Sequence, residues 1–227
     1  FSLSGGEIVA ITGLVGTGKS ELAECLFGLR QPPAGTFLLD GKSYQPLNNR
    51  DAVRQGVFMA AKDRANSSMI PGFDISQNLT LPFLPDFTRL GTILRPRERN
   101  RAKEMIDWLG VVCQSEQDML TSLSGGNQQK VVVARELSRD LRLFVAAQPT
   151  RGVDVGSIEF IHKRIVETRD AGVPVVVVST ELDEIEALAD RILVMYRGKV
   201  VGIVPSDTSR DVLGLMMAGE HPEGAAA

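Results

Sequence analysis

The stretch GLVGTGKS, Gly13–Ser20, decides the fold of this chain, because it matches the pattern G-x-x-x-x-G-K-[ST] in full. It follows the apolar run Ile8–Ile11, which predicts a buried strand, and it opens Ser20–Leu29, whose apolar residues recur on one helical face. Strand, glycine loop and helix are the context in which such a loop wraps backbone amides around phosphate. These flanks argue against an ordinary glycine turn, and the stretch predicts a phosphate-binding loop.

The loop residues have separate expected roles. The loop amides and the helix N-terminus supply partial positive charge to phosphate oxygens. Lys19 is expected to reach the terminal phosphates of a nucleotide, and the Ser20 hydroxyl is the expected oxygen ligand of Mg²⁺. The predicted nucleotide-binding residues are Gly13, Leu14, Val15, Gly16, Thr17, Gly18, Lys19 and Ser20.

Composition limits the class of protein. A length of 227 residues with 43% hydrophobic and 23% charged residues is typical of one large globular domain, or of a compact domain with a subdomain. The net charge of −3 gives no reason to expect nucleic acid as a partner. Two cysteines, Cys25 and Cys113, are too few to indicate a disulfide framework or a metal site. The sequence contains no run of 18 apolar residues, which is the length that would predict a membrane span.

Strands alternating with helices predict an α/β fold with a mainly parallel sheet and a small antiparallel β portion. The stretch 74–122 lacks strand alternation, and 97–109 has apolar residues at helical spacing with arginines and glutamates on a face expected to be solvated. We therefore expect one domain over 1–219, with an inserted helical subdomain at about 74–125 and a disordered tail at 220–227. The expected strands are 35–41, 57–59, 143–147, 173–179 and a hairpin of 191–196 with 200–204; the other expected helices are 126–139, 157–170 and 182–189.

The first residues, Phe1–Glu7, are typical of the middle of a β-hairpin, which is expected of a fragment cut from a longer protein.

A second motif, LSGGNQQ at Leu123–Gln129, opens the helix predicted at 126–139. A serine hydroxyl, two glycines and a helix N-terminus form another anion site, although a serine-capped helix alone would explain the same residues. The third motif is PTRGVD at Pro149–Asp154.

With these three motifs in this order, the chain resembles the ATPase subunits of ATP-binding cassette (ABC) transporters over nearly its full length. The resemblance implies a P-loop NTPase core and a head-to-tail pair of cassettes with two ATP sites between them. The signature residues Ser124, Gly125, Gly126 and Asn127 would then contact the ATP that the partner cassette holds. Asp154 would lie at the interface and link the two sites, and the region 60–85 with the helical subdomain would face a membrane permease.

Further segments look like one branch, the sugar importers whose two cassettes are fused in one chain. Five segments look like the second cassette of such a protein: GLVGTGKSEL, KDR at Lys62–Arg64, LSGGNQQK, PTRGVDVGS and STELDEIEALADRILVM. Members of this branch take up monosaccharides, and some relatives carry nucleosides or a signalling sugar derivative. The resemblance implies a first cassette N-terminal in the same polypeptide, a permease, indirectly a sugar-binding protein, and a peripheral place on the cytoplasmic face of the membrane.

Four positions depart from the family pattern. Ala147 stands where the family has the aspartate that helps to hold Mg²⁺, and Gln148 stands where it has the glutamate that polarises the attacking water. Lys62 replaces the glutamine or glutamate of the switch loop, and Thr180 replaces the histidine that contacts the γ-phosphate. No catalytic residue of this chain's own site is then intact. We expect the site to bind ATP, with Mg²⁺ bound weakly or not at all, while the signature completes the partner's hydrolytic site.

Two alternatives stay open. In the first alternative, the domain is purely structural and binds no nucleotide. In the second, it is a non-transport ABC ATPase that acts on DNA or ribosomes. Intact Gly13, Gly18, Lys19 and Ser20 argue against the first. The second would require a long coiled-coil insertion or intact hydrolytic carboxylates, neither of which the sequence has.

Overall fold

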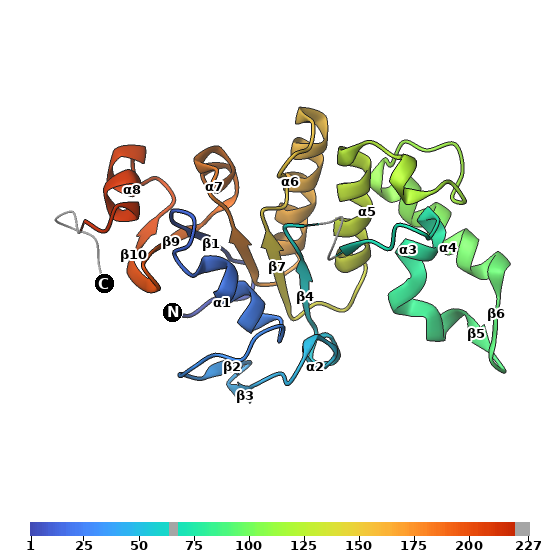
Figure 1. Ribbon diagram of the computed structural model, residues 1–227, viewed down its shortest axis with the longest axis horizontal. Coiled ribbons are helices and arrows are strands. Elements are labelled where there is room, and N and C mark those ends of the chain that lie inside the picture. The colour runs from blue at the N-terminus through green and yellow to red at the C-terminus, as the bar shows by residue number, and fades with distance from the viewer. Residues whose placement is uncertain (64–67, 221–227) are drawn as a thin grey trace. The chain divides into compact units, whose positions relative to one another are not determined.

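The structure is a computed structural model that describes residues 1–63 and 68–220 (Figure 1). It divides into two compact units. The sheet unit consists of Phe1–Met59, Asp140–Gln148 and the described residues from His162 onward. The helical unit consists of Ala60–Arg139 and Pro149–Ile161.

The sheet unit is built on a six-stranded sheet formed by the described residues, in the order β10-β9-β1-β8-β7-β4. Strand β1 pairs in parallel with β8 and β9, β7 pairs in parallel with β8, and β10 pairs antiparallel with β9. This confirms the predicted α/β fold with a mainly parallel sheet. The strand bounds are β1 Ile8–Thr12, β4 Val57–Ala60, β7 Leu143–Ala147, β8 Val175–Val178, β9 Arg191–Tyr196 and β10 Lys199–Pro205.

The central strands are covered on both faces. Every residue of β1, β7 and β8 is buried, which is typical of parallel strands between helices. Helices α7 and α8 pack on one face, where their apolar side chains meet Ala10, Ile192 and Val194. Helix α8 was not expected from the sequence. The helices that begin in this unit are α1 Lys19–Leu26, α2 Asn49–Arg54, α7 Leu182–Leu188 and α8 Arg210–Met217, whereas α6 Val155–Asp170 begins in the helical unit.

A separate hairpin pairs β2 (Phe37–Leu39) with β3 (Lys42–Tyr44). Its turn residues Asp40 and Gly41 have φ of 50° and 72°, as the predicted Asp-Gly turn requires. The hairpin expected at Phe1–Glu7 is wrong for the described chain, because no residue there is assigned to a strand. A strand needs a partner strand that bonds to its backbone, and Phe1–Leu3 has no partner strand in the described part of the chain.

The helical unit has its own core, formed by buried residues of α3, α4 and α5 that include Leu79, Met105, Leu109 and Val131. Its elements are α3 Ile75–Thr80, the 3-10 helix Leu81–Phe87, β5 Thr88–Arg89, β6 Thr92–Ile93, α4 Arg95–Leu109, a 3-10 turn at Leu120–Ser122 and α5 Gly125–Leu137. The small hairpin β5–β6 lies within the stretch 74–122, which lacks strand alternation in the sequence and was expected to be a helical subdomain. Two-residue strands are too short to show an alternating pattern, so periodicity could not have revealed them.

Two predictions fall partly outside the described residues, namely Arg64 of the KDR segment and all but Glu220 of the predicted tail. Within the described ranges, no helix is both long and apolar enough to cross a bilayer.

Candidate functional site

The loop Gly13–Ser20 lies in the sheet unit between β1 and α1, where the sequence pattern predicted it. Gly13, Gly16 and Gly18 all have positive φ, at 146°, 81° and 96°. At Gly13 the need for glycine is also steric, because a Cβ there would overlap the carbonyl oxygen of Met195 in β9. At Gly16 nothing lies within 4 Å of such a Cβ. The loop backbone at Gly16 is therefore open to the close approach of a ligand.

Lys19 is folded into this loop. Its side chain is buried, and its Nζ donates a hydrogen bond of 2.8 Å to the carbonyl of Leu14. The Thr17 hydroxyl donates to the same carbonyl at 2.9 Å. A buried cation inside a curved loop with exposed backbone is the arrangement that attracts a phosphate anion. Ser20 is half-buried in the first turn of α1, next to this cation.

The strand register places Ala147 and Gln148 at the carboxyl-terminal ends of the parallel strands, where the loop also begins. Ile11 pairs with Val178, and Val178 pairs with Ala147. Because parallel strands end at one edge, the residues that follow them lie along the same edge. The Gln148 amide donates to the carbonyl of Val178 at 2.7 Å.

Gln148 has an unusual backbone. Its φ is 49°, a left-handed conformation that costs a side-chain-bearing residue about 1–2 kcal/mol. Ala147 is buried and Thr180, two residues after β8, is half-buried. No carboxylate occupies position 147 or 148. Among the described residues, no group of three or more His, Cys, Asp or Glu is arranged to hold a metal ion.

The signature lies in the helical unit. Ser124 is the N-cap of α5 and accepts hydrogen bonds from the Asn127 amide at 3.4 Å and from Asn127 Nδ2 at 3.1 Å. Ser124 is exposed, Gly125 and Asn127 are half-buried, and Gly126 is buried. The serine cap that the sequence left as an alternative is present, and it leaves the first amides of a 13-residue helix at an exposed end.

Asp154 lies beside this helix start. A Cβ on Gly126 would overlap both Asp154 Oδ2 and Ser157 Oγ. Asp154 accepts hydrogen bonds of 2.9 Å from the Ser157 amide and from the Ser157 hydroxyl. These two bonds lower the pKa of Asp154, so its carboxylate stays charged.

Sequence reasoning missed Ser157. Its signal was available, since an aspartate three residues before a serine at the start of a helix is an N-cap pattern. Lys62 is exposed shortly after β4 and belongs to the helical unit, as do Ser124–Asn127 and Asp154. The phosphate loop, Ala147, Gln148 and Thr180 belong to the sheet unit.

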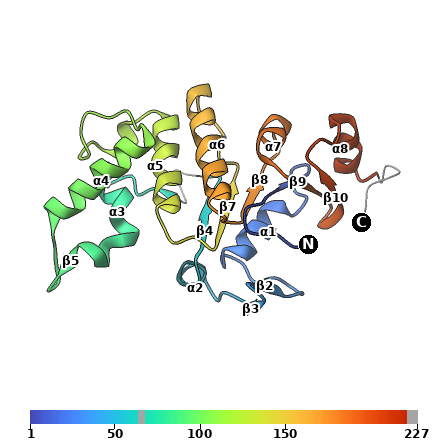
Figure 2. The same ribbon diagram turned by 180° about the vertical axis from the view of Figure 1, so that it is seen from behind.

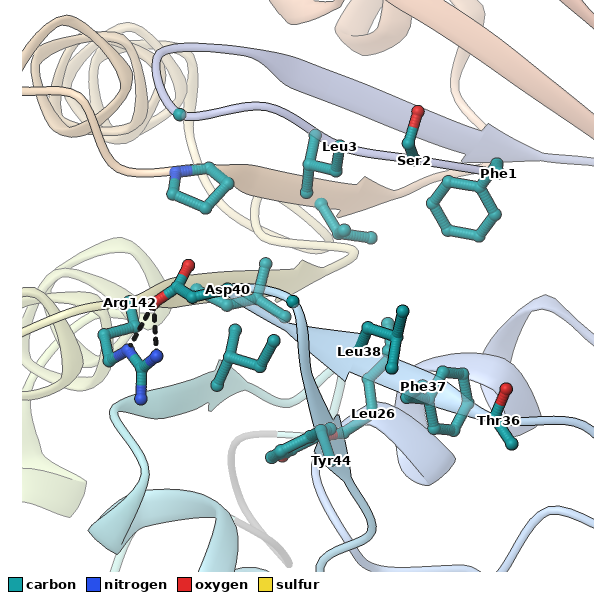
Figure 3. A pocket seen from close by; sticks show the side chains of 16 residues that line it. Phe1, Ser2, Leu3, Leu26, Thr36, Phe37, Leu38, Asp40, Tyr44 and Arg142 are labelled. Carbon is teal, nitrogen blue, oxygen red and sulfur yellow. Dashed lines mark hydrogen bonds and ion pairs between the residues drawn. The ribbon is translucent and has the colours of Figure 1, made fainter.

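A separate cavity of about 580 Å³ lies in the sheet unit between Phe1–Leu3 and the hairpin β2–β3 (Figure 3). Its walls are mostly apolar, and the Asp40–Arg142 ion pair lies at one side, with Arg142 Nε 2.9 Å from Asp40 Oδ2. It includes none of the predicted site residues.

Comparison with known proteins finds relatives that are similar over nearly the whole chain. The family profile described as "ABC transporter" matches residues 1–151. The guanosine import ATP-binding protein NupO of Bacillus subtilis is 41% identical over 99% of this chain and 45% of its own length. The ribose import ATP-binding protein RbsA of Lactococcus lactis is 35% identical over 97% of this chain and 45% of its own length. The chain thus spans about half the length of the curated relatives it matches.

Solved structures show the same fold. The dimeric bacterial ABC transporter cassette MJ0796 superposes with a TM-score of 0.75 at 25% identity, over 92% of this chain and 89% of that chain. A dimeric post-hydrolysis state of the same cassette, bound to ADP and phosphate, superposes with a TM-score of 0.77 at 24% identity, over 92% of this chain and 89% of that chain.

Proposed function

This chain belongs to the ABC transporter family of ATP-binding proteins, and from that premise we propose that it is the second, C-terminal cassette of an importer for a monosaccharide or a nucleoside. The matched relatives that import guanosine and ribose are about twice as long as this chain, which supports a second cassette in the same polypeptide. A permease and a substrate-binding protein complete the importer, and the cassette is peripheral on the cytoplasmic face of the membrane.

The observation that carries the proposal is the buried Lys19 inside the glycine loop. Lys19 donates to the Leu14 carbonyl, and this bond is weak compared with the attraction of an ammonium group to phosphate. On ATP binding Lys19 exchanges the Leu14 carbonyl for the terminal phosphates, while the loop amides take the other oxygens. Gly13–Ser20 are the ATP-binding residues of this proposal.

The ATP site of this chain hydrolyses poorly, because the groups at positions 147 and 148 lack the required carboxylates. Ala147 offers no oxygen to the water shell of Mg²⁺, which leaves Ser20 as the protein's only ligand from these positions. Gln148 has no basicity, and loss of a general base costs about 10²–10⁴ in rate. The site holds ATP with little help from Mg²⁺ and turns it over slowly or not at all.

The signature has a different role, at the partner's site. Exposed Ser124 and the amides at the start of α5 present hydrogen-bond donors and partial positive charge to the ATP of the first cassette. Asp154, which Ser157 holds charged beside Gly126, lies at the interface and couples the two sites. The first cassette hydrolyses ATP, and this one completes its site.

An ATP titration by calorimetry tests binding, carried out first with Mg²⁺ and then with EDTA. We expect saturable binding whose affinity barely depends on Mg²⁺, and a loss of at least tenfold in affinity for Lys19→Ala. Ala147→Asp should make the affinity depend on Mg²⁺, whereas the uncharged control Ala147→Asn should not. Absence of binding would favour the alternative of a purely structural cassette. Strong Mg²⁺ dependence in the unmodified chain would contradict the impaired site.

A further inference from the structure

The segment of residues 86–104 is cationic in an acidic chain. It carries six basic residues against three acidic ones, whereas the whole chain has a net charge of −3. The basic residues are Arg89, Arg95, Arg97, Arg99, Arg101 and Lys103, and the acidic ones are Asp86, Glu98 and Glu104. The segment covers the hairpin β5–β6 and the first two thirds of α4, which continue directly into one another in the helical unit (Figures 1 and 2).

Part of this charge is neutralised within the segment. Glu98 is buried and accepts bonds from the Thr80 hydroxyl at 2.9 Å and from Arg95 at 2.8 Å. Arg101 pairs with Glu104 at 3.0 Å. The exposed Arg89, Arg97 and Arg99 make no ion pair with any described residue. They leave uncompensated positive charge on the hairpin, at Arg89, and on the first turns of α4, at Arg97 and Arg99.

At the tip of this hairpin stands an apolar residue in a strained backbone. Leu90 is 97% exposed, and its φ is 50°. Leu90 and Gly91 form a two-residue turn with positive φ at both positions, a geometry for which asparagine followed by glycine is preferred. A leucine there loses backbone energy and gains no packing in the described chain. Such an outlier points to a contact outside the chain.

We propose that this surface, which we call the cationic tip (Arg89, Leu90, Arg97 and Arg99), binds the anionic phospholipid surface of a membrane. An apolar residue at the extremity of a hairpin inserts among acyl chains, while the arginines of the hairpin and of the first turns of α4 meet lipid phosphates. A soluble anion or a nucleic acid would use the arginines but not the leucine. An anionic bilayer uses both and is the occupant that fits the charge and the exposed Leu90 together.

The magnitudes are those of a weak, reversible contact. Each arginine near an anionic lipid surface raises affinity about fivefold at low salt, and this part is screened as ionic strength rises. Leu90 adds a hydrophobic contribution to the affinity, which salt does not screen. The tip would hold the cassette against the bilayer without the permease, an activity separate from ATP binding by Lys19.

Vesicle binding by the full chain tests this. The chain has a single tryptophan, Trp108, on α4, which serves as an energy-transfer donor to dansyl-labelled lipid in the vesicles. We expect binding to phosphatidylcholine vesicles that contain phosphatidylglycerol, and no binding to phosphatidylcholine alone. Arg97→Glu with Arg99→Glu should weaken binding at least 25-fold at low salt.

Leu90→Asn should fold, because asparagine tolerates the positive φ of the turn. This variant should bind the vesicles more weakly, and its midpoint of thermal unfolding should be higher. The matched controls are Leu47→Asn, at an exposed leucine of the sheet unit, and Arg50→Glu with Arg54→Glu on α2. These controls should bind as the unmodified chain does.

Failure of the unmodified chain to bind the anionic vesicles would overturn the proposal and leave an acidic protein segment as the partner of the tip. Equal losses in the tip variants and in the controls would also overturn it, because they would indicate a non-specific charge effect. ATP titration of the Leu90→Asn variant should match the unmodified chain.

Discussion

Gly126 and Asp154 are so close that a single methyl group on Gly126 would overlap the Asp154 carboxylate. The same methyl would overlap Ser157, whose hydroxyl and amide both donate to Asp154. The start of α5 and the residue before α6 are thus fitted to each other through a missing side chain. This contact joins two of the three motifs that the sequence showed separately.

Gly126→Ala should therefore destabilise the protein by about 1–3 kcal/mol, the usual cost of overpacking, despite the better helix propensity of alanine. The control is Gly156→Ala, where the new Cβ would lie 3.6 Å from Asp154, an ordinary contact. Alanine at this helical position should be neutral or stabilise by up to about 1 kcal/mol. Urea unfolding of both variants measures the difference, and equal effects would contradict the close fit.

Ser124 and Lys19 should have unequal importance for turnover in the proposed two-cassette polypeptide. If this chain completes the partner's site, Ser124→Ala removes the N-cap and a donor to the ATP that is hydrolysed, so turnover should fall by tenfold or more. Lys19→Ala should abolish ATP binding here and lower turnover less. Steady-state phosphate release measures both. A larger effect of Lys19→Ala would reverse the proposed roles of the two sites.

Carboxylates introduced at positions 147 and 148 should restore ATP hydrolysis at this site only in part. Gln148→Glu returns a general base to the end of β7, and with Ala147→Asp it also returns a carboxylate for Mg²⁺. We expect phosphate release at this site in single-turnover measurements of the double variant. The matched control is Ala147→Asn with Gln148 unchanged, because asparagine and glutamine are the uncharged isosteres of the two introduced carboxylates. Equal rates in the double variant and in this control would show that the missing carboxylates do not limit hydrolysis.

Acid should weaken the contact between the N-terminal segment and β9. Glu7 accepts bonds from Arg191 Nε at 2.5 Å and from the Ser4 amide at 2.8 Å. The hydrogen bond from Arg191 is the main reason that the pKa of Glu7 is lowered. A lowered carboxyl pKa stabilises the folded state above the unfolded-state pKa of about 4.3 and loses this stabilisation as pH falls through the folded-state value.

Glu7→Gln should accordingly lose at most about 1 kcal/mol at pH 7, because Arg191 is partly exposed to solvent. The difference from the unmodified protein should shrink as the pH falls below the unfolded-state pKa of about 4.3, and it should vanish once Glu7 is protonated in the folded state as well. Unfolding in urea at a series of pH values measures this, with the exposed Glu159→Gln as the control. A difference that persists at low pH would show that packing, not charge, explains the effect.

The sequence by itself predicted the fold class and the elements that carry the loop. Apolar runs such as Val175–Val178 and helical spacing in 97–109 are local patterns, and the glycines of Gly13–Ser20 report backbone angles that other residues avoid. The same local reasoning placed Ser124 at a helix start. The two-residue strands of β5–β6 and helix α8 escaped it.

Only the tertiary structure decided which distant residues meet. The register that aligns Ile11, Val178 and Ala147, the overlap that forbids a side chain at Gly126, and the carbonyl of Met195 behind Gly13 depend on pairings between strands and helices far apart in the chain. A local pattern states what each segment buries, but long-range packing chooses its neighbour. That choice rests on the free energy of the whole core, which no single segment encodes.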